Sequence, residues 1–302
     1  MTKTGICDVH THIFPRDIPE KWDWYAAQDK TFAALTDNNG PSRVKEVFST
    51  PEETLACADE AGVELIVMQG WYWNSMALCR RHNDFMAEVI RDYPDRFAAF
   101  AAINPTCGEE AVEEVYRCRE LGFAGVGELG PGGNHFALDD PGLIRVLEAC
   151  DKLKLPVNFH VGEPIGHVYP GKDLTPLAGF YDLAERFPSL TMILAHMGGG
   201  LPYYELMPEV RRLFKNVVYD LAANPLLYDI RSVKLTVDLV GADKVLFGTD
   251  FPLTIYPRQC LDRNFSLFVD NVVENSGLSE EELTLVMREN CLRVLGRQTV
   301  RA

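Results

Sequence analysis

Eight short apolar runs alternate with amphipathic segments of helical period along the whole 302-residue chain. This alternation is typical of α/β proteins with parallel strands. An open doubly wound sheet would be expected to carry a G-x-G-x-x-G turn after its first strand, and this chain has none there. We therefore predict a (β/α)8 barrel, and the lack of repeats or linkers favours a single domain over residues 1–302. The predicted strands cover residues 5–10, 63–69, 97–103, 123–128, 156–161, 190–195, 217–221 and 244–249.

Helix start signals support this assignment between the strands. Thr50 with Glu53, and Ser279 with Glu282, have the spacing of capping boxes. Asn74 is the predicted cap of the helix that follows the second strand, and Thr175-Pro176 is expected to open another.

One connection is much longer than the others. About fifty residues separate the first strand from the second, and the segment 13–49 contains several tryptophan, tyrosine and phenylalanine residues. Because this extended loop leaves the carboxyl end of a strand, it could form a lid over the barrel mouth or support a dimer contact. A plain surface excursion is the alternative.

Polar residues close four of the apolar runs. His10 and His12 end GICDVHTH, and His160, His196 and Asp250 end LPVNFH, LTMILAH and KVLFGTD. Histidines at i and i+2 on a strand point to the same side, and a barrel brings all strand carboxyl ends to one face. Nitrogen and carboxylate ligands suit a borderline divalent ion such as zinc. The pattern therefore predicts a metal-dependent enzyme, in which Asp250 binds metal, accepts a proton from metal-bound water, or does both.

Composition restricts the partners and the location. A net charge of −15 argues against a nucleic-acid surface, and no apolar stretch approaches the length of a membrane span. The chain enters its first strand without an apolar leader, and its eight cysteines show no C-x-x-C spacing. We expect a cytoplasmic protein with reduced cysteines, a small-molecule substrate, and neither nucleic-acid nor membrane partners.

The segments DVHTHIFP, NFHVGEP, LAHMGGG and LFGTDFP, which follow one another between residues 8 and 252, resemble the amidohydrolase superfamily. They are most similar to its amidohydrolase-related branch (family 2), which contains aminocarboxymuconate-semialdehyde decarboxylase and related metal-dependent hydrolases. The resemblance implies a (β/α)8 barrel, zinc or a similar divalent ion, and chemistry by metal-bound hydroxide. It assigns His10, His12, His160 and Asp250 as metal ligands. His196 matches a histidine that binds a second metal in some members and acts on substrate or water in others. Members often form homodimers, so a homodimer is compatible with the resemblance.

Glu128 departs from the branch that the other motifs match. It ends the fourth predicted strand in GVGELGPGG, where binuclear members of the superfamily place a bridging carboxylated lysine or a glutamate. If Glu128 binds metal, the site could hold two ions. The alternatives are that Glu128 hydrogen-bonds a ligand histidine or binds substrate, which would leave one ion.

Five further residues are candidates for binding substrate. Trp71 and Tyr72 follow the second strand and could form an apolar wall for a planar compound. Glu163, His167 and Lys172 lie in the loop HVGEPIGHVYPGK after the fifth strand. The lysine and histidine could hold a substrate carboxylate, although a solvated loop explains them equally well.

The leading hypothesis for the reaction is hydrolysis of an amide, lactone or ester of a small organic acid. Metal-activated water would attack the carbonyl carbon, with Asp250 and His196 as the catalytic residues. The alternative is non-oxidative decarboxylation of an aromatic or unsaturated carboxylic acid. Several decarboxylases of the branch carry glutamate in place of the first histidine of HxH, and this chain keeps His10, which favours hydrolysis. A barrel that binds metal without catalysis is a third hypothesis, disfavoured because every expected ligand is present.

Overall fold

The structure, a computed structural model, describes residues 5–37, 48–166, 172–260 and 262–297. Its eight strands are β1 (Ile6–Thr11), β2 (Val63–Met68), β3 (Phe97–Ala101), β4 (Gly125–Leu129), β5 (Val157–Phe159), β6 (Met192–Leu194), β7 (Val217–Asp220) and β8 (Val245–Leu246). They pair in parallel in the order of the sequence, β1 to β8. Each lies inside or within one residue of its predicted range, because strands that a parallel sheet buries on both faces have near-continuous apolar sequences.

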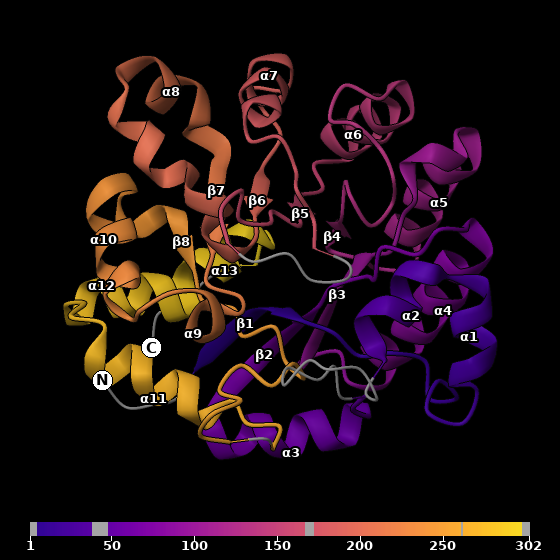
Figure 1. The fold of residues 1–302 in the computed structure, drawn as a ribbon, viewed down its shortest axis with the longest axis horizontal. Helices are drawn as coiled ribbons and strands as arrows, with labels where there is room; N and C mark the ends of the chain where they lie inside the picture. The colour runs from indigo at the N-terminus through magenta and orange to yellow at the C-terminus, as the bar shows by residue number, and fades with distance from the viewer. Residues whose placement is uncertain (1–4, 38–47, 167–171, 261, 298–302) are drawn as a thin grey trace.

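The sheet closes on itself. Thr11 forms an isolated parallel bridge with Phe251, and the Val9 amide donates to the Phe247 carbonyl over 2.9 Å. Helices surround the strands, as Figure 1 shows in the view down the shortest axis. The predicted (β/α)8 barrel is therefore confirmed.

The α-helices of the described residues are α1 (Trp22–Gln28), α2 (Lys30–Thr36), α3 (Pro51–Ala61), α4 (Met76–Asp92), α5 (Glu109–Glu120), α6 (Pro141–Leu153), α7 (Ala178–Arg186), α8 (Pro208–Leu213), α9 (Asn224–Leu227), α10 (Arg231–Val240), α11 (Ser266–Asn275), α12 (Glu280–Thr284) and α13 (Asn290–Val294). The segments η1 (Pro105–Cys107), η2 (His196–Leu206), η3 (Phe214–Asn216) and η4 (Ala242–Lys244) are 3-10 helices, and η5 (Leu285–Glu289) is a π-helix.

Both predicted capping boxes are present, at Thr50 before α3 and at Ser279 before α12. The predicted cap of α4 is wrong by one residue, because Ser75 accepts from the Leu78 amide. Asn74 is already engaged, since its side-chain amide donates to Asp29 Oδ1 over 3.1 Å. The helix expected to open at Thr175-Pro176 begins later, at Ala178.

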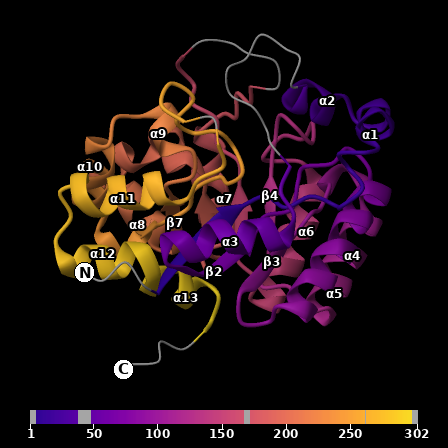
Figure 2. The ribbon, with the colours of Figure 1, turned by 90° about the horizontal axis from the view of Figure 1, so that it is seen from below.

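The long excursion after β1 packs on the outside of the barrel. Helices α1 and α2 lie together beside α4 (Figures 1 and 2). Phe32 of α2 packs against Trp73, with ring centroids 5.0 Å apart, and Phe14 packs against Trp71 at 5.1 Å. The Asp29 carboxylate accepts the Asn74 amide over 2.8 Å. These contacts tie the excursion to the loop after β2. Residues 38–47 of the expected lid lie outside the described residues, so its roles as lid or dimer contact stay predictions.

Among the helices of the described residues, none combines the length and the apolar character needed to cross a bilayer.

Candidate metal centre

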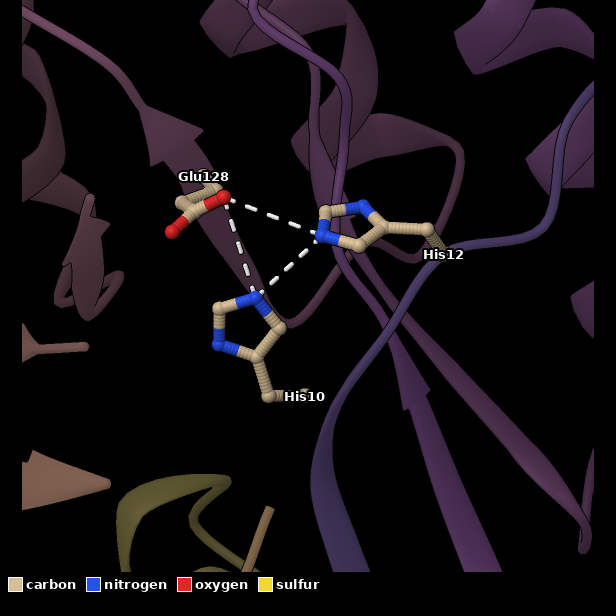
Figure 3. A group of neighbouring side chains, drawn as sticks. All are labelled: His10, His12 and Glu128. Carbon is tan, nitrogen blue, oxygen red and sulfur yellow. Dashed lines mark hydrogen bonds and ion pairs between the residues drawn. The ribbon is translucent and has the colours of Figure 1, made fainter. Parts of the chain in front are cut away.

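His10 of β1, His12 just beyond the end of β1, and Glu128 of β4 meet inside the barrel mouth. His10 and His12 project from the same side of the strand, and their Nε2 atoms are 3.3 Å apart. Each of these atoms lies 3.7 Å from Glu128 Oε2. Figure 3 shows the three side chains pointing toward one another. All three are buried, so the barrel holds a carboxylate and two imidazoles away from bulk water.

Asp250 approaches the same histidines from the chain after β8. Its Oδ1 lies 3.3 Å from His12 Nε2 and 3.7 Å from His10 Nε2. Its backbone amide donates to the His10 carbonyl over 2.9 Å, and its φ of 68° is in the left-handed region, which non-glycine residues rarely adopt. The pairing with β1 therefore holds Asp250 in a conformation that turns its carboxylate toward the histidines.

The other carboxylate oxygen of Glu128 meets two further histidines. Glu128 Oε1 lies 2.9 Å from His160 Nδ1 and 3.3 Å from His196 Nε2. These two histidine nitrogens are 3.1 Å apart. Glu128 thus belongs to two donor groups, one with His10 and His12 and one with His160 and His196. The six residues predicted as ligands therefore lie together, since the four histidines contact Glu128 and Asp250 contacts two of those histidines.

The donor set fits a divalent cation. Four ligands about 2.0–2.1 Å from one tetrahedrally coordinated ion would lie about 3.4 Å from one another. The contacts among His10, His12, Asp250 and Glu128 that are given above run from 3.3 to 3.7 Å. Imidazole nitrogen and carboxylate oxygen are also the ligands that zinc, manganese and iron share.

The pKa shifts of the metal-free centre also indicate a cation site. Burial disfavours a charged imidazole, but Asp220 and Glu128 outweigh it and raise the pKa of His10 well above its ordinary value. The pKa of His196 rises to about 9, because its contact with Glu128 outweighs burial. Burial likewise opposes ionisation of Asp250, yet contact with His12 lowers its pKa to about 2. In the metal-free centre, protons on His10 and His196 thus balance the buried carboxylates, and a cation bound at His10 would take the place of the proton there.

Asp220, at the end of β7, orients two of these histidines and was missed by the sequence analysis. Its Oδ2 lies 2.8 Å from His10 Nδ1. Its Oδ1 accepts the backbone amides of His196 and Ala222 over 3.0 and 3.1 Å. Because Nδ1 of His10 faces Asp220, and Nδ1 of His196 faces the Ala222 carbonyl at 3.0 Å, both rings present Nε2 to the centre. Asp220 closes an apolar run just as Asp250 does, and that was the available signal.

Trp71 and Tyr72, the two residues predicted to form an apolar wall, lie next to two histidines of the centre. Their rings stack with centroids 4.6 Å apart and planes at 22°. Trp71 lies edge-on to His12 at 5.6 Å, and Tyr72 lies 5.8 Å from His160. A Cβ at Gly133 would come within 2.3 Å of the Tyr72 ring, so only glycine lets the loop after β4 support this side chain. Close packing against Gly133 therefore holds the Tyr72 ring in place, while the role of the pair as a wall for substrate stays a prediction.

The loop after β5 is described in part. Glu163 is half-buried three residues beyond His160, and the Tyr228 hydroxyl of the chain after α9 lies beside its carboxylate. Lys172 lies at the far end of the same loop. His167, the third predicted substrate-binding residue of this loop, falls outside the described residues. Binding of substrate by these residues stays a prediction.

Comparisons with known proteins show which chains share this sequence and this barrel. A family model described as Amidohydrolase matches residues 7–297. The chain is 26% identical to the 2-amino-3-carboxymuconate-6-semialdehyde decarboxylase of Dictyostelium discoideum, over 96% of this chain and 91% of that one. It is also 26% identical to a gamma-resorcylate decarboxylase of Polaromonas, over 72% of this chain and 82% of that protein. A crystal structure of a dihydroxybenzoic acid decarboxylase from Polaromonas, with bound manganese and an inhibitor, superposes with a TM-score of 0.69 at 21% identity, covering 97% of each chain.

These relatives contradict the prediction of hydrolysis. Each is a decarboxylase, which breaks a carbon–carbon bond rather than an amide or ester. The prediction relied on the retention of His10 in HxH, which is an argument about ligands. A set of ligands determines which ion binds, whereas the bond that breaks depends on how the substrate is positioned next to that ion. The hydrolytic hypothesis is therefore wrong on these comparisons, and its decarboxylase alternative agrees with them.

Proposed function

This chain belongs to the amidohydrolase family, and from that premise we propose that it is a metal-dependent enzyme that decarboxylates an aromatic or unsaturated carboxylic acid. The observation that carries the proposal is the match along nearly the whole chain to a protein named as a decarboxylase of an unsaturated amino acid derivative. The buried donor set and the adjacent aromatic wall support it, because they combine a cation site with a surface for a planar acid.

The ion would be held by His10, His12, Asp250 and Glu128. When bound there, a divalent cation supplies positive charge that anchors the substrate carboxylate and a neighbouring oxygen. We propose zinc, because the 3.3–3.7 Å spacings given above among these four donors fit tetrahedral coordination. Manganese, which the Polaromonas structure contains, is the alternative.

The wall of Trp71 and Tyr72 would bind the flat face of the acid. Stacking on a fixed aromatic pair restricts rotation of the substrate and keeps water away from the carbon that loses carbon dioxide. Packing holds both side chains in place, since their exposed fractions are only 2% and 8%.

Decarboxylation leaves an electron pair on the substrate carbon, and that carbon must receive a proton as carbon dioxide departs. Asp250, with its pKa near 2, is ionised at neutral pH and has no proton to give. His196 lies outside the proposed ligand set, beside Glu128 Oε1, so an ion beside Oε2 leaves its Nε2 able to carry a proton. Its Nδ1 is engaged by the Ala222 carbonyl, so Nε2 is the atom that faces the centre. We therefore assign proton delivery to His196 Nε2, which regains its proton from solvent, and metal binding to Asp250.

The test is release of carbon dioxide from a panel of acids that includes 2,6-dihydroxybenzoate and 5-carboxyvanillate. Metal-loaded protein should convert at least one acid, chelation should abolish conversion, and His196→Asn should lower kcat by about 10²–10⁴-fold. Asp238→Asn, on the outer face of α10, should leave kcat unchanged and serves as the control. Full activity after chelation would refute the proposal.

The number of ions follows from Glu128, which faces two donor groups. We propose one ion beside Oε2, which leaves His196 free to carry its proton. A second ion beside Oε1, with His160 and His196 as ligands, is the alternative. Metal content by mass spectrometry distinguishes them: one ion per chain is expected, and two ions that fall to one in Glu128→Ala would show the shared carboxylate and remove His196 as the proton donor.

A further inference from the structure

The loop that follows β5, at the carboxyl end of the barrel, contains the carboxylate of Glu163. Its Oε1 is enclosed and has no hydrogen-bond partner among the described residues. The side chain as a whole remains partly exposed. Leaving a carboxylate oxygen enclosed without a donor is unfavourable, so such an atom marks a position where a donor from outside the chain can bind.

Glu163 is close to the metal centre and is held in place. It follows His160, which contacts Glu128, by three residues, and three residues span at most about 10 Å. A Cβ at Gly199 would lie 3.0 Å from the Gly162 carbonyl, so the loop packs on the chain just after His196. The Tyr228 hydroxyl lies beside the carboxylate from the other side. The loops after β5, β6 and β7 therefore enclose Glu163 together.

An unused donor lies across the mouth from this acceptor. Trp71 Nε1 is buried, has no partner among the described residues, and belongs to the loop after β2. Figure 1 shows β2 on the opposite side of the barrel from β5, β6 and β7. The two unpartnered groups thus lie in loops on opposite sides of the barrel, with the Trp71 ring 5.6 Å from His12 and the Glu163 carboxylate in the loop after β5.

We propose that Glu163, positioned by Tyr228, is a subsite that selects acids bearing a hydroxyl or amino group remote from the reacting carboxylate. The proposal rests on the proposed function, since the acid is the substrate of the metal centre. The negative charge of Glu163 repels the acid's own carboxylate and directs it toward the cation and Trp71. At the other end of the substrate, an O–H or N–H group donates to Oε1. A methoxy group or a second carboxylate has no proton to donate and leaves Oε1 without a partner.

The test compares the binding of matched benzoates by isothermal titration calorimetry to the metal-loaded protein. The probes are 2-, 3- and 4-hydroxybenzoate, each paired with the methoxybenzoate of the same position. A hydrogen bond to a charged acceptor is worth at least about tenfold in affinity. We expect the hydroxy acid to bind at least about tenfold more tightly than its methoxy partner at position 3 or 4, and the preference to fall below about threefold in Glu163→Gln, whose amide can donate to a methoxy oxygen.

Two further variants separate the subsite from a general effect on folding. Tyr228→Phe removes the hydroxyl beside the carboxylate and should reduce the same preference without changing metal content. Glu185→Gln, an exposed carboxylate of α7, should keep the wild-type preference. A preference that is absent in the wild type, including binding of neither acid, would overturn the proposal. So would a preference confined to position 2, or one that Glu163→Gln keeps.

The same samples distinguish this proposal from the proposed function. Binding preference is measured without turnover, whereas decarboxylation is read as carbon dioxide. A preference that depends on Glu163, with no carbon dioxide from any acid, would keep the subsite and refute the decarboxylase. Carbon dioxide release without a binding preference that depends on Glu163 would refute the subsite and keep the decarboxylase.

Discussion

Replacing Asp220 by asparagine should weaken metal binding although Asp220 is not itself a proposed ligand. The carboxylate uses both oxygens: Oδ2 faces His10 Nδ1 at 2.8 Å, and Oδ1 accepts two backbone amides at 3.0 and 3.1 Å. An amide of the same shape has a single acceptor oxygen. If that oxygen faces the backbone, the NH₂ group confronts Nδ1–H of His10, and if it faces His10, the backbone amides lose their acceptor.

Either orientation leaves a buried donor unpaired, because Asp220 and His10 are both fully buried. The cost of such a donor is about 1–3 kcal/mol. Loss of an acceptor behind a ligand histidine typically costs about 10–100-fold in metal affinity, which is about 1.4–2.7 kcal/mol and falls in the same range. We therefore expect the dissociation constant of the ion to rise about 10–100-fold in Asp220→Asn.

The assay is competition with a chromophoric chelator at pH 7.5, using Asp238→Asn on α10 as the matched control. Urea unfolding of the metal-free proteins measures how much of the loss is general destabilisation. A dissociation constant within about threefold of wild type would refute the reasoning, because it would mean that His10 does not need Asp220 to present Nε2.

Two other predictions concern buried groups away from the ligands. His82, fully buried with Nε2 2.9 Å from the Ile13 carbonyl, has a pKa lowered by burial to about 4, below the ordinary 6.5, so the unfolded chain takes up its proton first. The contribution of His82 to the free energy of unfolding is complete above pH 6.5 and is lost as pH falls toward 4. In urea unfolding, the wild type should lose about 2 kcal/mol more than His82→Gln between pH 7.5 and pH 5. Equal losses in the two proteins would contradict the lowered pKa. Gly133→Ala places a methyl group within 2.3 Å of the Tyr72 ring, which must then shift. We therefore expect KM for the acid to rise about tenfold while metal content stays unchanged. An unchanged KM would show that Tyr72 does not contact substrate.

The barrel could be predicted from the sequence because its signals are local. Each apolar run and each capping box is read within a few residues, and a set of eight such units has one economical closed arrangement. The cap of α4 was misplaced for the opposite reason. Asn74 has the right side chain, but Asp29, 45 residues earlier, already binds it. No local pattern contains that contact.

The same distinction applies to the site. HxH and the polar residues at strand ends indicate which side chains share the barrel mouth, since topology alone brings them together. The pairing of Asp220 with His10 spans 210 residues and depends on the closed sheet, so the sequence offered only a carboxylate at a strand end. The reaction could not be predicted from the ligand pattern, because the same metal ligands occur in enzymes that break different bonds.

Isotope tracing of a single turnover tests the central claim most directly. The metal-loaded protein would be incubated in D₂O with the acid that the panel identifies, labelled with ¹³C at its carboxyl group. We predict one labelled carbon dioxide and one deuterium on the vacated carbon for each molecule converted, with both signals lost on chelation and strongly slowed in His196→Asn. Conversion that retains the label in the product, or labelled carbon dioxide that persists after chelation, would contradict the account.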